Sequence, residues 1–406
     1  MSNLISRLIS SLRVVESASE GSATSKLPSG LRLPHQIRVA HLATRLIIAG
    51  LGNVVASLVR GMPKPQYRST VVCLEEADVL GRLLKDEGHE VIELGRYRRR
   101  DFGLFVRIAI FLRRNHIDIL HCHDELSWFY GTLGARLGGV NRVVVTMHGR
   151  RADFSMRHRW EQRILAKLSR SIICVSSYLQ RQIQTELRVL PDKVPVIRNG
   201  IPINPIDDDA EIRHRVRQAL NLSEDEIVVG CVGRLDTVKN LDLLIDAVHK
   251  ARAVIPSLRL AIVGEGPCRD HLFQKISQLG LVEAVIFTGL RRDVHELLCS
   301  FDLYVCSSDY EGVSLSILEA MAARRAIIAT AVGGNVEIVS QNETGILVQP
   351  RDIQEMVEAI VALSRDSEHR VRLGQQARIF VEKYFSQVRM IDDYNRLYHS
   401  VLSDQC

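Results

Sequence analysis

The sequence predicts an α/β protein with two doubly wound parallel sheets, and three observations support this fold class. Short apolar runs alternate with helical patterns along most of the chain, which is typical of parallel sheets covered by helices. The alternation stops after Asn199-Gly200, where Pro202, Pro205 and the aspartates at 207–209 indicate a linker, and then restarts. At 406 residues, the chain is long enough for two hydrophobic cores. We therefore expect two domains with a cleft between them.

The first series of strands predicts one domain over residues 36–200. Its apolar runs are short and bounded by turn residues, which is the pattern of buried strands. They lie at 37–42, 69–73, 91–94, 117–120, 143–146, 172–175 and 194–197. Residues 1–35 are predicted to form an appendage and linker, in which Leu4, Leu8 and Leu12 share one face of a short helix. A frayed terminus and a weak membrane-surface contact both fit this segment.

The second series predicts another domain over residues 201–385. Its strands are expected at 227–232, 258–263, 284–287, 303–306, 326–329 and 345–348. Three helical patterns end the chain, at 353–363, 368–383 and 388–402. Ligands of doubly wound sheets bind at the carboxyl ends of the strands, so the loops that follow the strands are the candidate sites.

Charge is distributed unevenly along the chain. The net charge is +6, with an excess of Lys and Arg in residues 1–200 and an excess of Asp and Glu in residues 201–406. A basic half can face an anionic acceptor, a membrane surface or nucleic acid. We expect no nucleic-acid partner, because no motif for one is present.

One basic segment favours a peripheral contact with anionic membrane through the first domain. Arg96 and the arginines at 98–100 precede the apolar segment 102–112, and Arg113 and Arg114 follow it. A core-facing helix with a solvated basic face is the alternative. No apolar run approaches the roughly 18 residues of a membrane span. The eight cysteines form no C-x-x-C, and residues 1–11 lack a secretory signal. We therefore expect a cytoplasmic protein, peripheral on the inner face of the plasma membrane.

The strongest local motif is the segment from Glu311 to Glu319, followed by Ala320-Met321. It places two carboxylates eight positions apart, after a buried strand and around a Gly turn that opens an apolar helix. Free backbone N–H groups at a helix start are a natural seat for a diphosphate. The carboxylates on either side can accept hydrogen bonds from sugar hydroxyls. The N–H groups of this seat belong to Gly312, Val313, Ser314 and Leu315.

A second loop adds positive charge. Gly233 and Arg234 follow the strand 227–232, and Lys239 comes five residues after Arg234. A guanidinium binds a diphosphate through two hydrogen bonds, and the ammonium adds a second charge. A solvated basic loop is the alternative interpretation.

Other strand ends carry glycines or polar residues that let a backbone approach a ligand. Each such glycine by itself is also typical of an ordinary turn. The candidates are Gly50 and Gly52, Gly264, Leu290 and Arg291, and Gly333 and Gly334.

Histidines follow two further strands of the first domain. His148 comes after the strand 143–146, where it can donate to a sugar hydroxyl or stabilise charge at a reacting centre. A histidine satisfied within the core is the alternative. His121 and His123 lie on one face of another strand. Two ligands without a C-x-x-C favour packing or cleft lining over a metal site, and we assign no metal.

Together these motifs resemble the retaining glycosyltransferases of family four, which have the GT-B fold of two Rossmann-like domains. The resemblance covers roughly residues 37–402, and the exopolysaccharide and lipid-linked-glycan transferases look most similar. The motifs that carry it are Asn199-Gly200-Ile201, Gly233-Arg234-Leu235 with Lys239, Val263-Gly-Glu-Gly-Pro267, the Glu311 and Glu319 pair with Glu-Ala-Met, and Gly333-Gly334.

The resemblance implies a nucleotide-diphosphate sugar, UDP- or GDP-linked, held mainly by the second domain. Arg234 and Lys239 would neutralise the diphosphate leaving group, and Glu319 would hold the ribose hydroxyls. Glu311 would contact the donor sugar. His148 and Gly50 would reach the sugar and phosphate from the first domain, and a final helix within 386–406 would cross back onto that domain.

The implied reaction is transfer of a hexosyl group, with retention, to a glycan or a lipid-linked acceptor. No divalent metal and no resident cofactor are expected. His148, Arg234, Lys239 and Glu311 are the candidate catalytic residues. A GT-B-fold nucleotide-sugar epimerase or hydrolase is one alternative, and a non-catalytic sugar-nucleotide-binding partner is another. The presence of the charged residues of the motif argues against the second alternative.

Overall fold

The computed structural model describes residues 36–403, apart from 48–49, 97–100, 150–155 and 204–208. The predicted appendage at 1–35 therefore lies outside the described residues. The same holds for the arginines at 98–100 and for Pro205 in the predicted linker.

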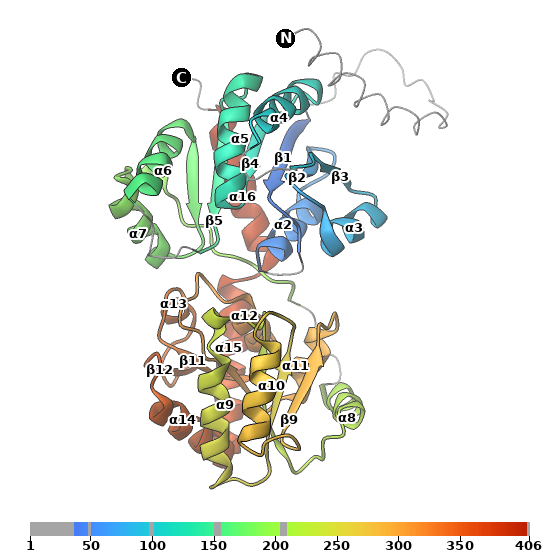
Figure 1. The fold of residues 1–406 in the computed structure, drawn as a ribbon, viewed down its shortest axis with the longest axis vertical. Helices are drawn as coiled ribbons and strands as arrows, with labels where there is room; N and C mark the ends of the chain where they lie inside the picture. The colour runs from blue at the N-terminus through green and yellow to red at the C-terminus, as the bar shows by residue number, and fades with distance from the viewer. Residues whose placement is uncertain (1–35, 48–49, 97–100, 150–155, 204–208, 404–406) are drawn as a thin grey trace. The chain divides into compact units, whose positions relative to one another are not determined.

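Two six-stranded parallel sheets confirm the predicted α/β fold class (Figure 1). Their strand orders are β3-β2-β1-β4-β5-β6 and β12-β11-β10-β7-β8-β9. Each sheet reverses its winding direction once, between β1 and β4 and between β7 and β10, where doubly wound sheets open a crevice. The strands are β1 Ile37–Ala43, β2 Tyr67–Cys73, β3 Glu90–Glu93, β4 Ile119–Cys122, β5 Val143–Met147, β6 Ser171–Cys174, β7 Ile227–Val232, β8 Leu258–Val263, β9 Val285–Gly289, β10 Leu303–Cys306, β11 Ala326–Thr330 and β12 Gly345–Val348.

The central strands are apolar on both faces because helices cover both sides of each sheet. All residues of β5 and β11 are buried. In Figure 1, α5 lies in front of the first sheet and α16 behind it. The helices are α2 Gly50–Gly61, α3 Asp78–Asp86, α4 Gly103–Arg114, α5 Glu125–Gly138, α6 Met156–Leu168, α7 Ser177–Leu187, α8 Asp209–Ala219, α9 Leu241–Arg252, α10 Arg269–Gln278, α11 Val294–Ser300, α12 Leu315–Ala322, α13 Asn335–Ile338, α14 Ile353–Arg365, α15 Ser367–Tyr384 and α16 Gln387–Ser403, with short 3-10 turns η2 Pro191–Lys193 and η3 Thr237–Lys239.

The predicted strand at 194–197 is wrong. Within it, Val196 makes an isolated bridge to Cys174, and the N–H of Ile197 donates to the Cys174 carbonyl over 3.0 Å. Pro195 has no N–H to donate, so it cannot extend a ladder along the edge of β6. The segment runs beside the sheet without becoming a seventh strand.

The chain crosses between the two halves twice, and the crossings are hydrogen-bonded to each other. The N–H of Ile201 donates to the Phe385 carbonyl over 2.9 Å, and the N–H of Gln387 donates to the Ile201 carbonyl over 2.8 Å. A Cβ on Gly200 would lie 2.5 Å from the Ser386 carbonyl oxygen, so this close approach needs glycine. After the second crossing, α16 packs against β1 and α2 of the first half through a core that includes Met390.

Candidate functional site

The loops at the carboxyl ends of the strands form one pocket of about 560 Å³, lined by both halves of the chain. Arg234 and Lys239 share it with the loop that begins at Glu311 and with the start of α12. The four candidate catalytic residues and most of the candidate binding residues are therefore brought together. The predicted residues in the lining are Gly50, His148, Gly233, Arg234, Lys239, Gly264, Leu290, Arg291, Glu311, Gly312, Val313, Ser314, Leu315 and Glu319.

Lys239 and Glu311 form the ion pair at the centre of the second half. The Lys239 Nζ lies 2.6 Å from the Glu311 Oε1, which also accepts a hydrogen bond from the Ser308 hydroxyl over 2.7 Å. Burial opposes the charge of Lys239, but the Glu311 carboxylate outweighs it and raises the pKa of the ammonium. Lys239 is therefore a fixed positive charge, held in place before any ligand arrives.

Local turn chemistry places this lysine. The Asp236 side chain accepts hydrogen bonds from the backbone N–H groups of Val238 and Lys239, and so caps the single turn η3. Arg234 precedes the cap and exposes 61% of its side chain, with only a 3.9 Å approach of its Nε to Asp236. The loop thus presents one ion-paired, partly buried cation and one exposed cation to the same pocket.

The start of α12 lies beside these cations. Ser314 is its N-cap, and its side chain makes no capping bond to the helix. The first N–H groups of a helix have no intrahelical partner, so this end attracts an anion. One turn further in, Glu319 is partly buried, and loss of solvent raises the pKa of its carboxyl to about 7.

Three predicted binding glycines lie outside the pocket lining and allow close packing of the backbone. A Cβ on Gly333 or on Gly334 would lie 1.8 Å from the carbonyl oxygen of Glu311 or of Gly312, respectively. A Cβ on Gly52 would lie 2.1 Å from the Ile47 carbonyl oxygen. Gly333 and Gly334 therefore support the Glu311 loop from behind.

His148 faces the Glu311 loop from the first half. A Cβ on Gly312 would lie 2.0 Å from the His148 carbonyl oxygen, so the two backbones touch. Both ring nitrogens of His148 are buried with no hydrogen-bond partner among the described residues. Burial lowers the pKa of this imidazole to about 4, so it is neutral at pH 7.

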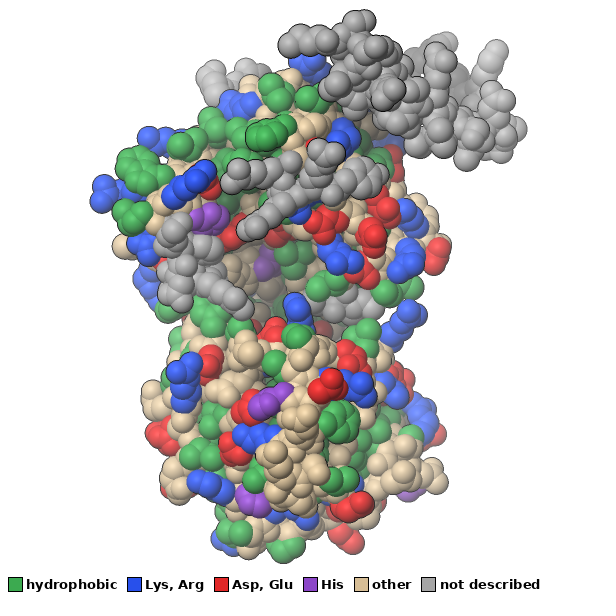
Figure 2. All heavy atoms as spheres, viewed as in Figure 1, with side chains coloured by type: hydrophobic (Ala, Val, Ile, Leu, Met, Phe, Trp, Pro, Cys, Tyr) green, Lys and Arg blue, Asp and Glu red, His purple; other side chains and the backbone are tan. Residues whose placement is uncertain are grey.

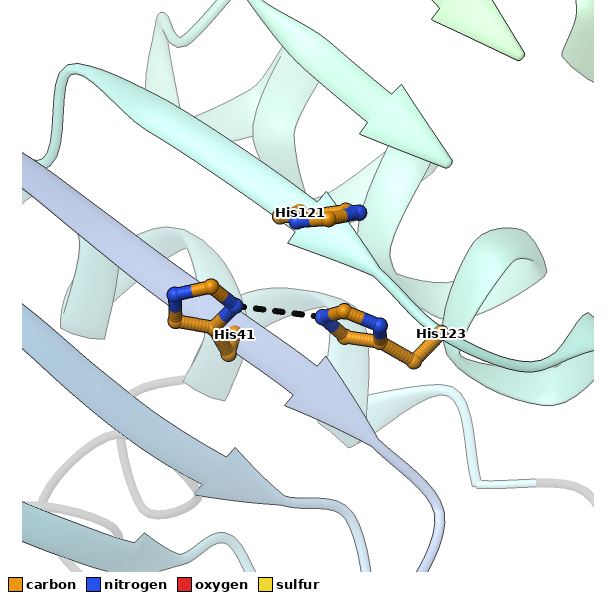
Figure 3. Close-up of side chains that lie close together, drawn as sticks. All are labelled: His41, His121 and His123. Carbon is orange, nitrogen blue, oxygen red and sulfur yellow. Dashed lines mark hydrogen bonds between the residues drawn. The ribbon is translucent and has the colours of Figure 1, made fainter. Parts of the chain in front are cut away.

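Behind His148 lies a cluster of three buried histidines, one from β1 and two from the end of β4 (Figure 3). The Nδ1 of His41 lies 3.1 Å from the Nε2 of His123, and one nitrogen from each of His41, His121 and His123 falls within 4.8 Å of the others. His121 already has a partner at each nitrogen: Tyr398 on α16 and Thr146 on β5, both at 2.7 Å. Ligation by His121 would break one of these bonds, so we assign this cluster to hydrogen bonding that ties the sheet to α16.

Some lining residues were not among the predicted site residues, although two of them flank the predicted Gly50 and Gly52. Ile47, Leu51 and Asn53 line the pocket from the first βα loop and α2. Asn199 also lines it; the sequence placed Asn199 at the linker break and in the Asn199-Gly200-Ile201 motif, but gave it no binding role.

Comparison with known families decides the identity of the chain. The family described as "Glycosyltransferase Family 4" matches residues 48–204, and the family described as "Glycosyl transferases group 1" matches residues 212–380. The chain belongs to glycosyltransferase family four. It is therefore an enzyme of the glycosyltransferase class (EC 2.4), as the motifs predicted.

Named relatives of this glycosyltransferase align along most of its length. It is 25% identical over 380 residues to the UDP-Gal:alpha-D-GlcNAc-diphosphoundecaprenol alpha-1,3-galactosyltransferase of Escherichia coli, covering 89% of this chain and 97% of that protein. It is 26% identical over 323 residues to the N-acetyl-alpha-D-glucosaminyl L-malate synthase of Bacillus anthracis, covering 76% of this chain and 81% of that protein.

Solved structures share the fold of the glycosyltransferase. A glycosyltransferase from Rickettsia africae superposes with a TM-score of 0.81 at 17% identity, covering 92% of this chain and all of that one. Anabaena Alr3699/HepE, solved with UDP and glucose, superposes with a TM-score of 0.79 at 21% identity, covering 90% of this chain and all of that one. These likenesses confirm the predicted GT-B fold.

Proposed function

We propose that this glycosyltransferase moves a hexosyl group from a nucleotide-diphosphate sugar to a lipid-linked or glycan acceptor, with retention and without a divalent metal. The observation that carries the proposal is the pocket in which Lys239, Arg234 and the start of α12 converge. We further propose a cytoplasmic enzyme that works peripherally at the inner face of the plasma membrane, with no nucleic-acid partner.

The proposed chemistry uses the charges of the second half. Negative charge develops on the diphosphate as its bond to the sugar breaks, and preorganised cations and N–H groups stabilise it. Lys239, Arg234 and the N–H groups from Gly312 to Leu315 are the groups in position to do so. No divalent ion is needed for that role.

The remaining pocket residues take the sugar and the nucleoside. Glu319 would accept hydrogen bonds from the ribose hydroxyls, and Glu311 would contact the donor sugar. The neutral His148 has two ring nitrogens without partners among the described residues, so one of them is suited to a sugar hydroxyl. We assign no covalent nucleophile. In the proposed reaction, the acceptor attacks the anomeric carbon on the same face of the sugar from which the diphosphate leaves.

The names of relatives support a nucleotide-diphosphate sugar and a lipid-linked acceptor. The Escherichia coli relative is named for UDP-Gal and a diphosphoundecaprenol-linked acceptor. A mannosyltransferase of Mycolicibacterium smegmatis, 29% identical over 281 residues, is named for GDP-mannose and a phosphatidylinositol mannoside. UDP- and GDP-linked hexoses are therefore the donors to test first.

The decisive experiment offers a panel of UDP- and GDP-hexoses to the full chain with a polyprenyl-diphosphate-linked sugar, in excess EDTA. Acceptor-dependent nucleotide release and a product with the donor's anomeric configuration are expected. An inverted product, or loss of turnover in EDTA, would contradict the corresponding part of the proposal. Release of free sugar without acceptor would favour the hydrolase alternative.

Donor affinity should depend on pH through Glu319. Its pKa is raised to about 7 in the free protein, whereas a bound ribose needs the carboxylate as acceptor. Each pH unit below 7 lowers the carboxylate fraction about tenfold, so the donor Kd should rise by up to about tenfold per unit. Calorimetric titrations in two buffers of different ionisation enthalpy should detect proton release on binding.

The matching stability effect has the opposite pH dependence. A raised carboxyl pKa favours the folded state at low pH, and this contribution is lost as pH rises through about 7. Glu319→Gln should therefore melt higher than the wild type at pH 8, bind donor weakly and lose the pH dependence. A wild type whose donor affinity is flat between pH 6 and 8 would contradict the role of Glu319.

A further inference from the structure

The outer face of α4 carries an exposed apolar stripe. Phe102, Val106 and Ile110 expose 77%, 47% and 37% of their surfaces. They follow one another at four-residue spacing, so they lie on one side of the helix. The opposite side of α4, which includes Leu104 and Ile108, is buried in the core of the first half. The stripe is therefore additional to the apolar face that the fold uses.

A second stripe of the same kind runs along α6. Met156, Trp160 and Ile164 expose 65%, 60% and 56% of their surfaces, again at four-residue spacing. This stripe was not predicted from the sequence. Both α4 and α6 contact α5, which lies between them.

A groove of about 660 Å³ lies between the two stripes, lined by residues of α4, α5 and α6 and by Asp101. Its floor carries aromatic rings, and three carboxylates belong to its lining: Asp101, Glu125 and Glu161. Phe105 and Phe129 meet edge to face at 5.8 Å inside it, next to Tyr130. Each of these carboxylates lies beside a basic side chain: Asp101 is 2.6 Å from Arg107, Glu161 is 3.2 Å from Arg157, and Glu125 is 3.5 Å from His158. The stripes and the groove together form one surface, which we call the α4–α6 face.

Positive charge borders this face. Arg113 and Arg114 end α4, which contains no acidic residue, and both are exposed. Arg157 and Lys167 are exposed on α6, where Glu161 is the single acidic residue. Figure 2 shows hydrophobic and basic side chains intermingled over α6. The combination of exposed aromatic, aliphatic and basic side chains suits the headgroup boundary of an anionic bilayer.

We propose that the α4–α6 face is a docking surface for an anionic lipid bilayer. The stripes enter the boundary between headgroups and acyl chains, and the basic residues contact the lipid phosphates. Among the described residues, no helix combines the length and apolar character needed to cross a bilayer. The inference deepens the proposed function, because a lipid-linked acceptor would then meet the first half of the enzyme at the membrane.

Tryptophan fluorescence provides a direct test with the full chain. The sequence contains two tryptophans: Trp128 is buried and donates to Ser169 over 2.8 Å, and Trp160 lies on the α6 stripe. Vesicles of equal parts phosphatidylcholine and phosphatidylglycerol should shift the emission to the blue, and brominated acyl chains should quench it. Trp160→Phe should abolish both signals. Absence of a shift and of quenching in the wild type would overturn the proposal.

Matched surface variants distinguish binding through this face from non-specific hydrophobic adsorption to vesicles. Phe102→Ser with Val106→Ser should weaken vesicle partitioning about tenfold or more, because two apolar side chains that would enter the bilayer are lost. Val371→Ser with Ile379→Ser removes two side chains of 58% and 57% exposure on α15, and should leave partitioning unchanged. The proposal would be contradicted if both double variants lost vesicle partitioning equally, or if neither lost any.

Two further measurements test whether a second copy of the chain covers the face, and whether the docking surface and the proposed function stand independently. A blue shift that grows with protein concentration in the absence of vesicles would show that a second copy covers the face, and would overturn the proposal. Nucleotide binding, measured by thermal shift without vesicles, should be the same in both variant pairs. A wild type that binds vesicles but no nucleotide would contradict the proposed function and leave the docking surface standing.

Discussion

Lys239→Ala should lower kcat/KM for glycosyl transfer by about three orders of magnitude. The substitution removes a partly buried cation that the structure holds 2.6 Å from Glu311 and inside the pocket. Loss of one preorganised donor to a developing negative charge typically costs a factor of about 10² to 10³, and this donor is also charged. Most of the loss is expected in kcat, because the charge on the leaving diphosphate grows towards the transition state.

Two further variants provide the comparison with Lys239→Ala. Arg234→Ala should also slow transfer by orders of magnitude, with a larger effect on donor binding, since this side chain is exposed at the pocket. Lys250→Ala removes an exposed lysine from the end of α9 and should leave turnover unchanged. Thermal unfolding should show that all three are folded. Near-normal turnover in both Lys239→Ala and Arg234→Ala would contradict the assigned roles.

Gly333→Ala should lower kcat by about two orders of magnitude or more, although this residue lies outside the pocket lining. The added Cβ would lie 1.8 Å from the Glu311 carbonyl oxygen, so the loop that carries Glu311 must move. A displacement of about 1 Å in a reacting group is enough for a hundredfold loss. Steady-state kinetics together with donor binding by thermal shift would measure the effect.

Gly139→Ala is the matched control for this prediction. Gly139 has a φ of +78° and Gly333 a φ of +51°, so alanine is strained by its backbone conformation at both positions. A Cβ on Gly139 meets no atom within 4 Å. Both variants should therefore lose some thermal stability, and only Gly333→Ala should lose activity. Equal activity in the two variants would show that the Glu311 loop does not need this support.

Strands of the two sheets were predictable because helices cover both of their faces. A strand such as β11 is apolar throughout, and this pattern is visible without any partner. The grouping of Arg234, Lys239 and Glu311 was predictable for a related reason: each follows a parallel strand, and parallel strands end at the same edge of a sheet. The one false strand, at 194–197, has the same apolar character but contains Pro195.

Features that depend on contacts across the fold could not be predicted. The sequence shows that Gly333 and Gly334 follow a strand. It does not show that the carbonyls of Glu311 and Gly312 lie against them. The pairing of His41 with His123 likewise follows from the register of β1 against β4. The exposed stripe on α6 resembles an ordinary amphipathic helix until the structure shows which of its sides is buried.

The hydrogen-bonded crossings at Ile201 and Phe385 restrict how the two halves of the enzyme can move relative to each other. Ile201 is hydrogen-bonded to the residues on both sides of Ser386, so the two crossing segments should move together. We therefore expect the two halves to rotate about a single hinge axis. Gly200 lets these segments lie in contact, and a bulkier residue there would force them apart. Substrate entry and product exit would then share one path of opening, and the two linked crossings would set its stiffness.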